Sequence, residues 1–569
     1  MSAVTNAAVP SVRQTNLYSP TATNPPTVAS RYYGSAVATS ADGSRSVVGE
    51  SGTTGIGGEV TVYSCTASGC TTSASLNALA TRTVSITQIS ITGKKATATT
   101  SSAHGFIPGE KITITGTGNT SFNVTNKEIS DVTNNTISFY ANSSDLAATS
   151  VSGTGVVDLA PSASGFGAAV DISDNGNLVL VGAPNFDVTY YQYTNYSTGS
   201  GASVNRRFGR AYLFEYISGA WALAKVFDRA VPTDLERYGT AVAISGDGSV
   251  SIITSYKNSG SVSNTAEVHI NTPNPSASPG PSGTPVIYSS WVLQQTINTT
   301  TGADVDISNN GNVIVLAGDA ATVGGFSSAG NAYIYTRASG TWTLTKTLAR
   351  TDISGQLNQT NYNFGWAVAV SDDGNTVGTL SYQQNDVYIY RYSAGAWGTP
   401  VNINPANAGS RDKETIALSA NGNVAMIGMP GDQVGCYASA GSIAFMEFSG
   451  GVWAQNGNLR SSPTIGSGNG FGRSIAISED GSSFAISGAP YESSNGLYAV
   501  GSVTVFSSFL SNTETTAPTL TLSQGCTNTY SSITTILQSD PTSSNSIKFT
   551  LTADESIDSS TIRSEEHTS

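Results

Sequence analysis

The sequence predicts an all-β protein built from many short antiparallel strands. Short runs of β-forming residues such as Tyr333-Ile334-Tyr335 recur along the chain, each bounded by Gly, Asn or Asp. Only 11% of the 569 residues are charged, whereas Gly alone numbers 60, so segments suited to long amphipathic helices are scarce. Because the chain is too long for one ordinary core, internal repeats are expected.

A repeated unit supports this expectation. It begins with an aromatic-Gly pair, continues through an Asp-Gly or Asn-Gly turn and ends near Gly-Ala-Pro. Copies begin at Phe166-Gly167, Phe364-Gly365 and Phe471-Gly472, with degenerate copies at Tyr33-Gly34, Tyr238-Gly239, Thr301-Gly302 and Thr415. Each turn suggests a two-residue hairpin, because both central residues can take positive φ. Seven successive four-stranded units predict a seven-bladed β-propeller.

The last unit lacks a fourth strand. Its first three strands are expected between Ser474 and Phe506, and no convincing fourth precedes Pro518. The segment from Gln14 to Pro20 is similar to the segment that precedes Phe471-Gly472. We therefore predict that the N-terminal segment completes blade 7 and closes the ring. Residues 1–83 would form blade 1 and this closing strand, and residues 158–512 would form blades 2 to 7.

Residues 84–157 interrupt the repeat and predict a small inserted all-β module. The segment from His104-Gly105-Phe106 to Gly109-Glu110 resembles a β module that recurs in phage tail and virion proteins, with Glu110 in place of Asp. His104 is interpreted as a turn residue of this motif, not as a metal ligand.

The C-terminal part departs from the repeat. Residues 513–562 resemble the start of a bacterial immunoglobulin-like domain and contain too few strands for a complete sandwich. Residues 563–569 read as the translation of a sequencing adapter, and we interpret them as an artefact. The natural chain is expected to continue past Ile562.

The repeats resemble the FG-GAP repeats of integrin α-subunit propellers over roughly residues 10 to 508, without the insertion. This resemblance implies ligand binding through one loop face and raises the question of calcium, which needs several oxygen ligands in one loop. Turns such as Ser371-Asp372-Asp373-Gly374 lack a closing carboxylate. We predict metal-free hairpins and no cofactor, and calcium remains the alternative.

Other function classes are disfavoured by what the sequence contains. A net charge of −13 argues against nucleic-acid binding, and no apolar run is long enough for membrane insertion. Because no nucleophile elbow, P-loop or sialidase Asp-box appears, the chain is predicted not to be an enzyme. Cys65 and Cys70 flank a predicted hairpin and form either a disulfide or two free thiols. No signal peptide is visible between Met1 and Ser19.

The predicted partner-binding face carries the connections between strands two and three and between successive blades, whose lengths vary most. The segment from Asn185 to Phe208 holds the candidate ligand contacts Tyr190, Tyr191, Tyr193, Tyr196, Arg206 and Arg207. A solvated loop without a ligand is an equal alternative. The predicted function is adhesion or receptor binding to a surface protein or glycan, outside a cell or on a virion. The alternatives are a structural part of a viral tail or surface appendage and, less favoured, a carbohydrate-active enzyme.

Overall fold

The computed structural model describes much of residues 13–507. The described residues are 13–19, 31–52, 58–66, 69–77, 81–102, 104, 106, 108–133, 135–141, 143–158, 165–229, 236–256, 264–272, 290–299, 304–353, 356–383, 386–405, 414–433, 437–459, 467–493 and 499–507. The predicted immunoglobulin-like segment and the adapter-like tail lie outside them. In this part of the chain, no helix is long and apolar enough to cross a membrane.

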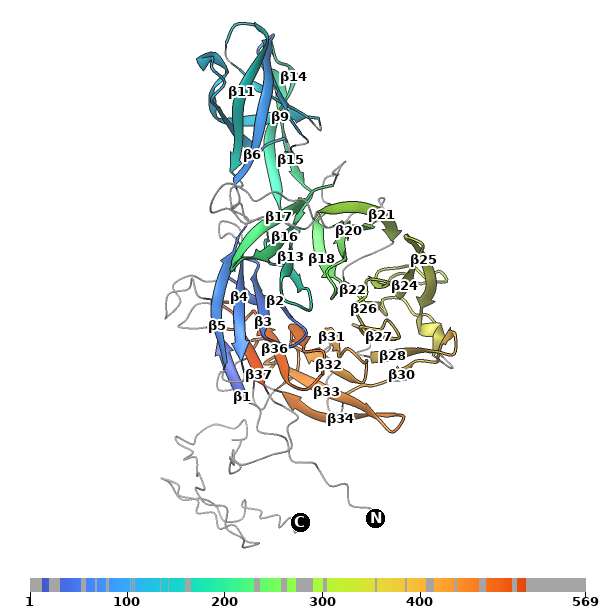
Figure 1. The fold of residues 1–569 in the computed structure, drawn as a ribbon. Helices are drawn as coiled ribbons and strands as arrows, with labels where there is room; N and C mark the ends of the chain where they lie inside the picture. Colours follow the sequence, from blue (N-terminus) through green and yellow to red (C-terminus); the bar gives the residue numbers. More distant parts are fainter. Residues whose placement is uncertain are drawn as a thin grey trace, which may run out of the picture.

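Seven antiparallel sheets surround a central axis and form the predicted propeller (Figure 1). Blade 1 contains β2 (Tyr33–Thr39), β3 (Arg45–Glu50), β4 (Glu59–Thr66) and β5 (Gly69–Leu76). Blade 2 contains β12 (Ala169–Ile172), β13 (Leu178–Ala183), β16 (Arg210–Ile217) and β17 (Ala220–Phe227). Blade 3 contains β18 (Tyr238–Ile244), β19 (Val250–Ser255), β20 (Asn264–Asn271) and β21 (Trp291–Thr299).

The remaining blades follow the same order from the axis outward. Blade 4 contains β22 (Val305–Ile307), β23 (Val313–Gly318), β24 (Asn331–Ala338) and β25 (Thr341–Leu348), followed by the 3-10 helix η2 (Arg350–Asp352). Blade 5 contains β26 (Phe364–Val370), β27 (Thr376–Ser381) and β28 (Asp386–Ser393), and its outer strand is split into β29 (Ala396–Trp397) and β30 (Val401–Asn402). Blade 6 contains β31 (Thr415–Leu418), β32 (Val424–Met429), β33 (Ser442–Ser449) and β34 (Val452–Leu459).

Blade 7 confirms the predicted closure by the N-terminal segment. It contains β35 (Ser474–Ile477), β36 (Phe484–Ala489), β37 (Ser502–Ser507) and, as its outer strand, β1 (Arg13–Leu17). β1 pairs with β37 from Arg13 opposite Ser507 to Leu17 opposite Val503. The two ends of the repeat array are therefore joined in one sheet.

The motif glycines allow neighbouring blades to approach each other closely. A Cβ atom on Gly182, in the Gly-Ala-Pro of blade 2, would lie 2.1 Å from the carbonyl oxygen of Gly239 in the Tyr-Gly of blade 3. A Cβ atom on Gly488 would lie 2.0 Å from the carbonyl oxygen of Gly34. Gly239 and Gly34 also have positive φ, which L residues rarely adopt. Both motifs are thus contact points between blades.

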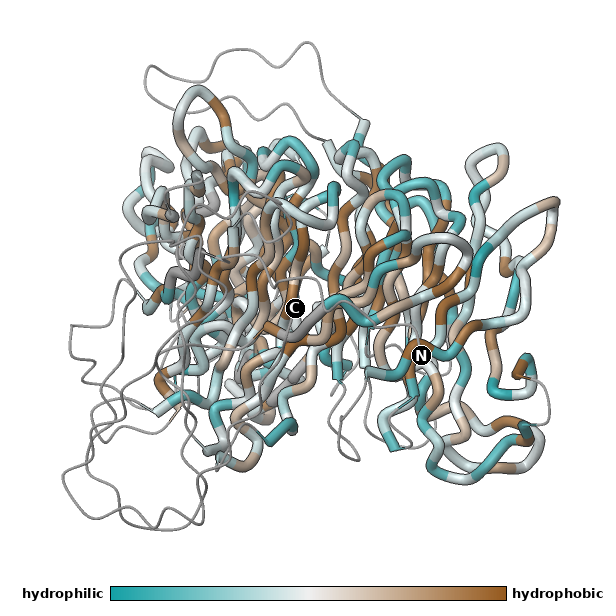
Figure 2. The backbone as a smooth tube through the Cα atoms, turned by 90° about the horizontal axis from the view of Figure 1, so that it is seen from below, coloured by the Kyte–Doolittle hydropathy of each residue, from teal (hydrophilic) through white to brown (hydrophobic). Residues whose placement is uncertain are grey.

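The core lies between the blades. The second strand of a blade is buried on both faces, and every residue of β13 is buried. One apolar cluster joins Val47 and Val62 of blade 1 to Val179 and Val181 of blade 2. Figure 2 shows the same arrangement, with apolar segments in the strands and polar residues at the turns.

The turns between strands one and two differ from the predicted two-residue hairpins. In blade 1, Ser40 N–H bonds the Arg45 carbonyl oxygen at 2.8 Å, which leaves four residues between them. Gly43 takes positive φ, whereas Asp42 does not. The hydroxyl of Ser40 and the backbone N–H of Ser44 both donate to the Asp42 carboxylate, each at 2.9 Å. These local bonds favour the wider turn.

These turns also form a continuous hydrogen-bonded ring around the axis. One backbone bond, 2.9–3.2 Å long, joins each blade to the next: Ala41 to Asp174, Asp174 to Gly246, Asp247 to Asn309, Asn309 to Asp372, Asp372 to Ala420, Ala420 to Glu479 and Glu479 to Ala41. The ring therefore ties all seven blades together at one end of the central channel.

The insertion folds into a closed six-stranded barrel with a core of its own. Its strands are β6 (Thr81–Thr92), β7 (Lys95–Thr100), β8 (Lys111–Thr115), β9 (Val124–Val132), β10 (Thr136–Tyr140) and β11 (Leu146–Asp158), with the 3-10 helix η1 (Thr120–Phe122). A separate hairpin, β14 (Asp187–Asn195) and β15 (Ser200–Arg207), lies beside it. Barrel and hairpin project together from the propeller (Figure 1), and we call the pair the arm.

Candidate binding face

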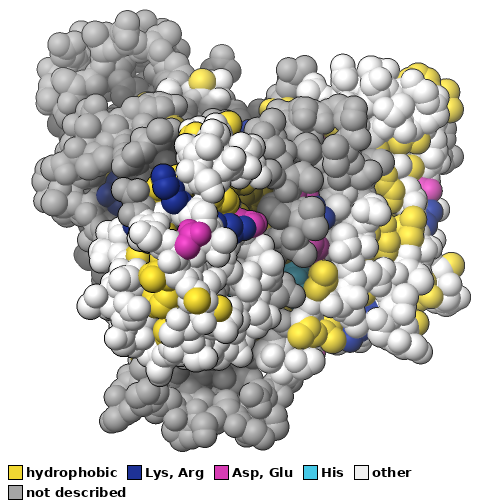
Figure 3. Space-filling view, turned by 90° about the horizontal axis from the view of Figure 1, so that it is seen from above, with side chains coloured by type: hydrophobic (Ala, Val, Ile, Leu, Met, Phe, Trp, Pro, Cys, Tyr) yellow, Lys and Arg dark blue, Asp and Glu magenta, His cyan; other side chains and the backbone are white. Residues whose placement is uncertain are grey.

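The arm is built from two connections on the predicted binding face. The barrel lies between β5 of blade 1 and β12 of blade 2, and the hairpin lies between β13 and β16 of blade 2. Seen from the side of the arm, most of the described surface carries uncharged side chains, with a few scattered charged groups (Figure 3). The face thus combines a protruding arm with a weakly charged surface.

A buried arginine joins the barrel to the propeller. Arg210, at the start of β16, is completely buried, and its Nη2 atom lies 2.8 Å from Oε1 of Glu110 in the barrel. Its Nε atom lies 2.5 Å from Oδ1 of Asp228, and its guanidinium lies 4.2 Å from the centre of the Phe186 ring. Burial alone would lower the pKa of Arg210, but Asp228 and Glu110 raise it above its usual value. Glu110 of the inserted motif therefore anchors the arm.

Three of the four candidate tyrosines take part in contacts within the arm. Tyr193 stacks on Tyr140 of the barrel, with ring centres 5.0 Å apart, and on Tyr196 at 4.9 Å. The Tyr191 ring meets Tyr193 edge-on at 4.7 Å. The hydroxyl of Tyr196 lies 2.6 Å from Oγ of Ser130. These aromatic contacts fix the hairpin against the barrel.

The remaining candidate residues lie at the base of the hairpin. Tyr190 is buried in a small cluster with Phe186 and Phe208. Arg206 and Arg207 belong to β15, and their side chains lie outside the described part. The structure thus assigns the tyrosines a structural role in the arm, while ligand contact by these six residues stays a prediction.

Two neighbouring loops on the same face present exposed apolar side chains that sequence reasoning missed. The loop between β23 and β24 bonds the segment between β25 and β26: Asn361 N–H donates to the Ser327 carbonyl oxygen at 2.8 Å and Asn363 N–H to that of Ser328 at 2.9 Å. Phe326 is 42% exposed and Leu357 is 76% exposed. In the sequence, the only feature that could have identified these two residues is that each is an apolar residue within a polar loop of variable length.

The segment that carries Leu357 is held by a buried arginine. Arg350 Nη2 donates to Oε1 of Gln356 at 2.6 Å, and Nη1 donates to the Leu357 carbonyl oxygen. The guanidinium lies 4.2 Å from the centre of the Tyr362 ring. These bonds hold the backbone at Leu357, whose side chain is exposed.

The central channel is a cavity of about 450 Å³ lined by the inner strands of all seven blades. Asp171 accepts hydrogen bonds from the backbone N–H of Ile172 at 2.9 Å and of Ile244 in the next blade at 2.7 Å. Asp306 makes the equivalent link to Val370 at 2.7 Å. Burial raises the pKa of Asp171 to about 7, although both N–H groups oppose this shift. These carboxyls join blades within the channel wall.

A polar cluster occupies the turn end of the channel. The side-chain amide of Asn309 donates to Asp174 and, at 3.3 Å, to Oε1 of Glu479. Burial, followed by the charges of Glu479 and Asp372, raises the pKa of Asp174 to about 7. Burial and the charge of Glu479 raise the pKa of Asp372 to about 6. Asp174 and Asp372 are therefore partly protonated near neutral pH.

In the propeller turns considered above for calcium, the carboxylates accept hydrogen bonds from the turn itself, and calcium binding stays untested. In blade 7, Oδ1 of Asp480 accepts hydrogen bonds from the Ser478 hydroxyl at 2.7 Å and from the Ser482 N–H at 2.9 Å. Partial burial raises the pKa of Asp480, but these bonds outweigh it and lower the pKa to about 2. The described residues contain no group of three or more His, Cys, Asp or Glu side chains arranged to hold a metal.

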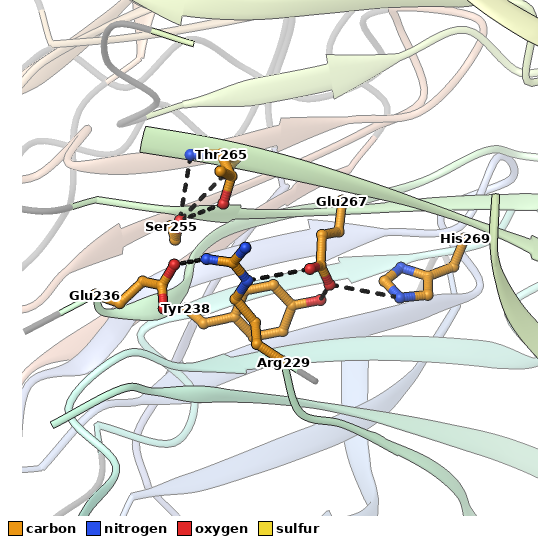
Figure 4. A network of polar contacts seen from close by, with 7 residues as sticks. All are labelled: Arg229, Glu236, Tyr238, Ser255, Thr265, Glu267 and His269. Carbon is orange, nitrogen blue, oxygen red and sulfur yellow. Dashed lines mark hydrogen bonds and ion pairs between the residues drawn. The ribbon is translucent and has the colours of Figure 1, made fainter. Parts of the chain in front are cut away.

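A second polar network is buried in blade 3 and at its junction with blade 2 (Figure 4). Arg229 pairs with Glu236 and, through Nε at 3.1 Å, with Oε1 of Glu267. The hydroxyl of Tyr238 donates to Oε2 of Glu267 at 2.8 Å. Burial and the charge of Lys225 lower the pKa of His269 to about 4. None of the residues in this network lines the channel cavity, so we assign it to holding blade 3.

Cys65 and Cys70 face each other across the β4–β5 hairpin and form a disulfide, with Cα atoms 4.0 Å apart. The sequence left this pair open between a disulfide and two thiols. Cys436 and Cys526 lie outside the described residues.

No model of a known protein family matches the chain, and no curated protein matches it. Among solved structures it is similar to a putative 6-phosphogluconolactonase from Bacteroides uniformis, with 13% identity over 67% of this chain and 89% of that chain and a TM-score of 0.34. It is also similar to a periplasmic gluconolactonase from Pseudomonas aeruginosa, with 13% identity over 49% of this chain and 74% of that chain and a TM-score of 0.33.

These neighbours correct the prediction that the chain is not an enzyme. Both carry the names of enzymes, so missing catalytic motifs were an insufficient ground for excluding catalysis. Short motifs identify only those active sites whose residues are close in sequence, whereas a propeller site draws on several blades. The low identity and TM-scores assign no reaction to this chain.

Proposed function

We propose that this protein binds a protein or glycan ligand at a surface outside a cell or on a virion, through the face that carries the arm. The observation that carries the proposal is the convergence of the inserted barrel and the longest loop of blade 2 in one anchored projection. Binding sites are commonly placed on loops that a rigid scaffold holds. The seven-bladed fold agrees with the FG-GAP resemblance, and we include membership of that family in the proposal.

The disulfide supports the location. Disulfides persist in oxidising compartments and are rare in reducing ones, and Cys65–Cys70 lies in the propeller itself. The low content of charged residues, 11% of the chain, agrees with this location.

The ligand contacts proposed here are Phe326 and Leu357, together with Tyr437 in the β32–β33 loop, which is 46% exposed. Exposed apolar side chains mark binding surfaces when they gather on one face, and these three lie in connections on the face that carries the arm. Val452, which is 65% exposed, begins β34 next to the β33–β34 turn on the opposite face and provides a matched control.

The test combines a glycan array, binding to intact cells and a hydrolysis screen with chromogenic glycosides, all on the full chain. We expect saturable binding that Phe326→Ala and Leu357→Ser each reduce at least tenfold and Val452→Ser leaves unchanged. Binding that responds to neither loop variant would contradict these contacts. Absence of any binding would favour a purely structural part, and glycoside turnover would favour a carbohydrate-active enzyme.

A further inference from the structure

Free sheet edges are protected almost everywhere in the described part of this molecule. The outer strands of blades 1, 2, 3, 4 and 6 each show a register shift in their pairing with the third strand. The outer strand of blade 5 is split, and that of blade 7 is the five-residue β1. The barrel is closed and has no edge. Such shifts and short strands keep other chains from pairing with an edge.

Strand β15 is the exception. Its pairing with β14 shifts register only beside the turn, between Tyr193 and Asn195, and is unbroken over the rest of the strand, from Arg207 opposite Asp187 to Gly201 opposite Tyr193. The other edge of β15 pairs with no strand of the described chain. Ala202 and Ser203 are exposed. The sequence from Thr198 to Asn205 contains no charged residue and no proline, which are the usual protections of an edge.

The arm itself shows which backbone groups face outward. The edge of β14 opposite β15 is covered by the barrel: the N–H of Tyr191 donates to Oε1 of Glu128 in β9 at 2.7 Å. Ser203 is the cross-strand partner of Tyr191. In an antiparallel pair both partners at such a position point their N–H and C=O groups away from each other. Ser203, and by alternation Gly201 and Asn205, therefore direct these groups to the free edge.

The strand is compatible with a second copy of itself. If two β15 strands pair antiparallel about Ser203, Ser203 lies opposite its own equivalent and Gly201 opposite Asn205. Arg206 and Arg207 then take positions opposite Ser200 and Gly199 rather than opposite each other. We propose that β15 is the interface of a homodimer in which two hairpins join into one four-stranded sheet. The inference is independent of the ligand proposed above.

Sedimentation equilibrium of the full chain, over a hundredfold range of concentration, tests the proposal. We expect a monomer–dimer equilibrium, with at least tenfold weaker association in Ser203→Pro. Proline removes the outward N–H, which the hairpin itself does not use, and fits an extended strand at an edge. Ser203→Ala keeps the N–H and should associate like the unchanged protein.

If a lowered melting temperature shows that Ser203→Pro disturbs the arm, a second variant tests the same interface. Ser203→Lys keeps the backbone donor but places two like charges together across the twofold axis. We expect weaker association at low salt and recovery at high salt. A chain that is monomeric at every concentration, or a dimer that both variants leave intact, would overturn the proposal. Binding of an unrelated extended peptide by a monomeric chain would assign the edge to a foreign partner instead.

Discussion

Replacing Gly182 by Ala tests whether the motif glycines set the distance between blades. The added Cβ would lie 2.1 Å from the Gly239 carbonyl oxygen and 3.2 Å from Cβ of Ala169. The φ of Gly182 lies outside the positive region, so alanine adds a clash without backbone strain. The obstructing atom belongs to the backbone of the next blade, which cannot move away easily because the protein interior is closely packed. Overpacking of this kind costs about 1–3 kcal/mol.

The assay is thermal unfolding followed by circular dichroism, with Gly398→Ala as the matched control. A Cβ on Gly398 would meet only the Arg391 carbonyl oxygen, at an ordinary 3.4 Å, and its φ is also not positive. We expect Gly182→Ala to lower the melting temperature by at least about 3 °C and Gly398→Ala to leave it unchanged. Equal melting temperatures for the two variants would refute the argument that the glycine is required by contact between blades.

Three further predictions concern the channel, the disulfide and the arm. Burial raises the pKa of Asp171 to about 7, so above pH 4 the folded chain keeps a proton that the unfolded chain has lost. The free energy of unfolding therefore falls as pH rises from about 4 to 7, by up to about 4 kcal/mol from this group. Chemical denaturation at a series of pH values should show a shallower fall in Asp171→Asn. The double variant Cys65→Ser, Cys70→Ser should lose about 2 kcal/mol of stability, and dithiothreitol should destabilise the unchanged protein but not this variant. Glu110→Gln leaves the buried guanidinium with one carboxylate and should cost about 1–3 kcal/mol, with faster proteolysis of the arm, whereas Lys95→Gln at the exposed pair with Asp131 should cost less than about 1 kcal/mol.

The sequence located the candidate site on one loop, and ligand contact by its residues stays a prediction. Tyr190, Tyr191, Tyr193 and Tyr196 were selected because tyrosine clusters are frequent in binding loops, but the structure places their rings against one another and against other parts of the arm. Sequence shows which loop holds these residues and not which surface the loop meets. The partner here is a barrel inserted more than fifty residues earlier in the chain, and only folding brings the two together.

The local pattern of residues determined the propeller. Aromatic-Gly pairs, Asp-Gly turns and Gly-Ala-Pro ends recur in register, so they define seven blades, and the segment before Pro20 supplies the strand missing from the last one. These signals are readable because each acts over a few neighbouring residues. The width of the turns was misjudged, since side-chain bonds such as Ser40 to Asp42 compete with the tight hairpin.

Tertiary structure alone decided how the arm is held and which edge is free. The contact of Arg210 with Glu110 joins residues a hundred positions apart, and the capping of Tyr191 N–H by Glu128 leaves β15 as the open side of the hairpin. Such features depend on packing between separate elements, which the pattern of residues along one segment does not predict. The sequence by itself therefore determined the scaffold, whereas the geometry of its binding face followed from contacts made only in the folded chain.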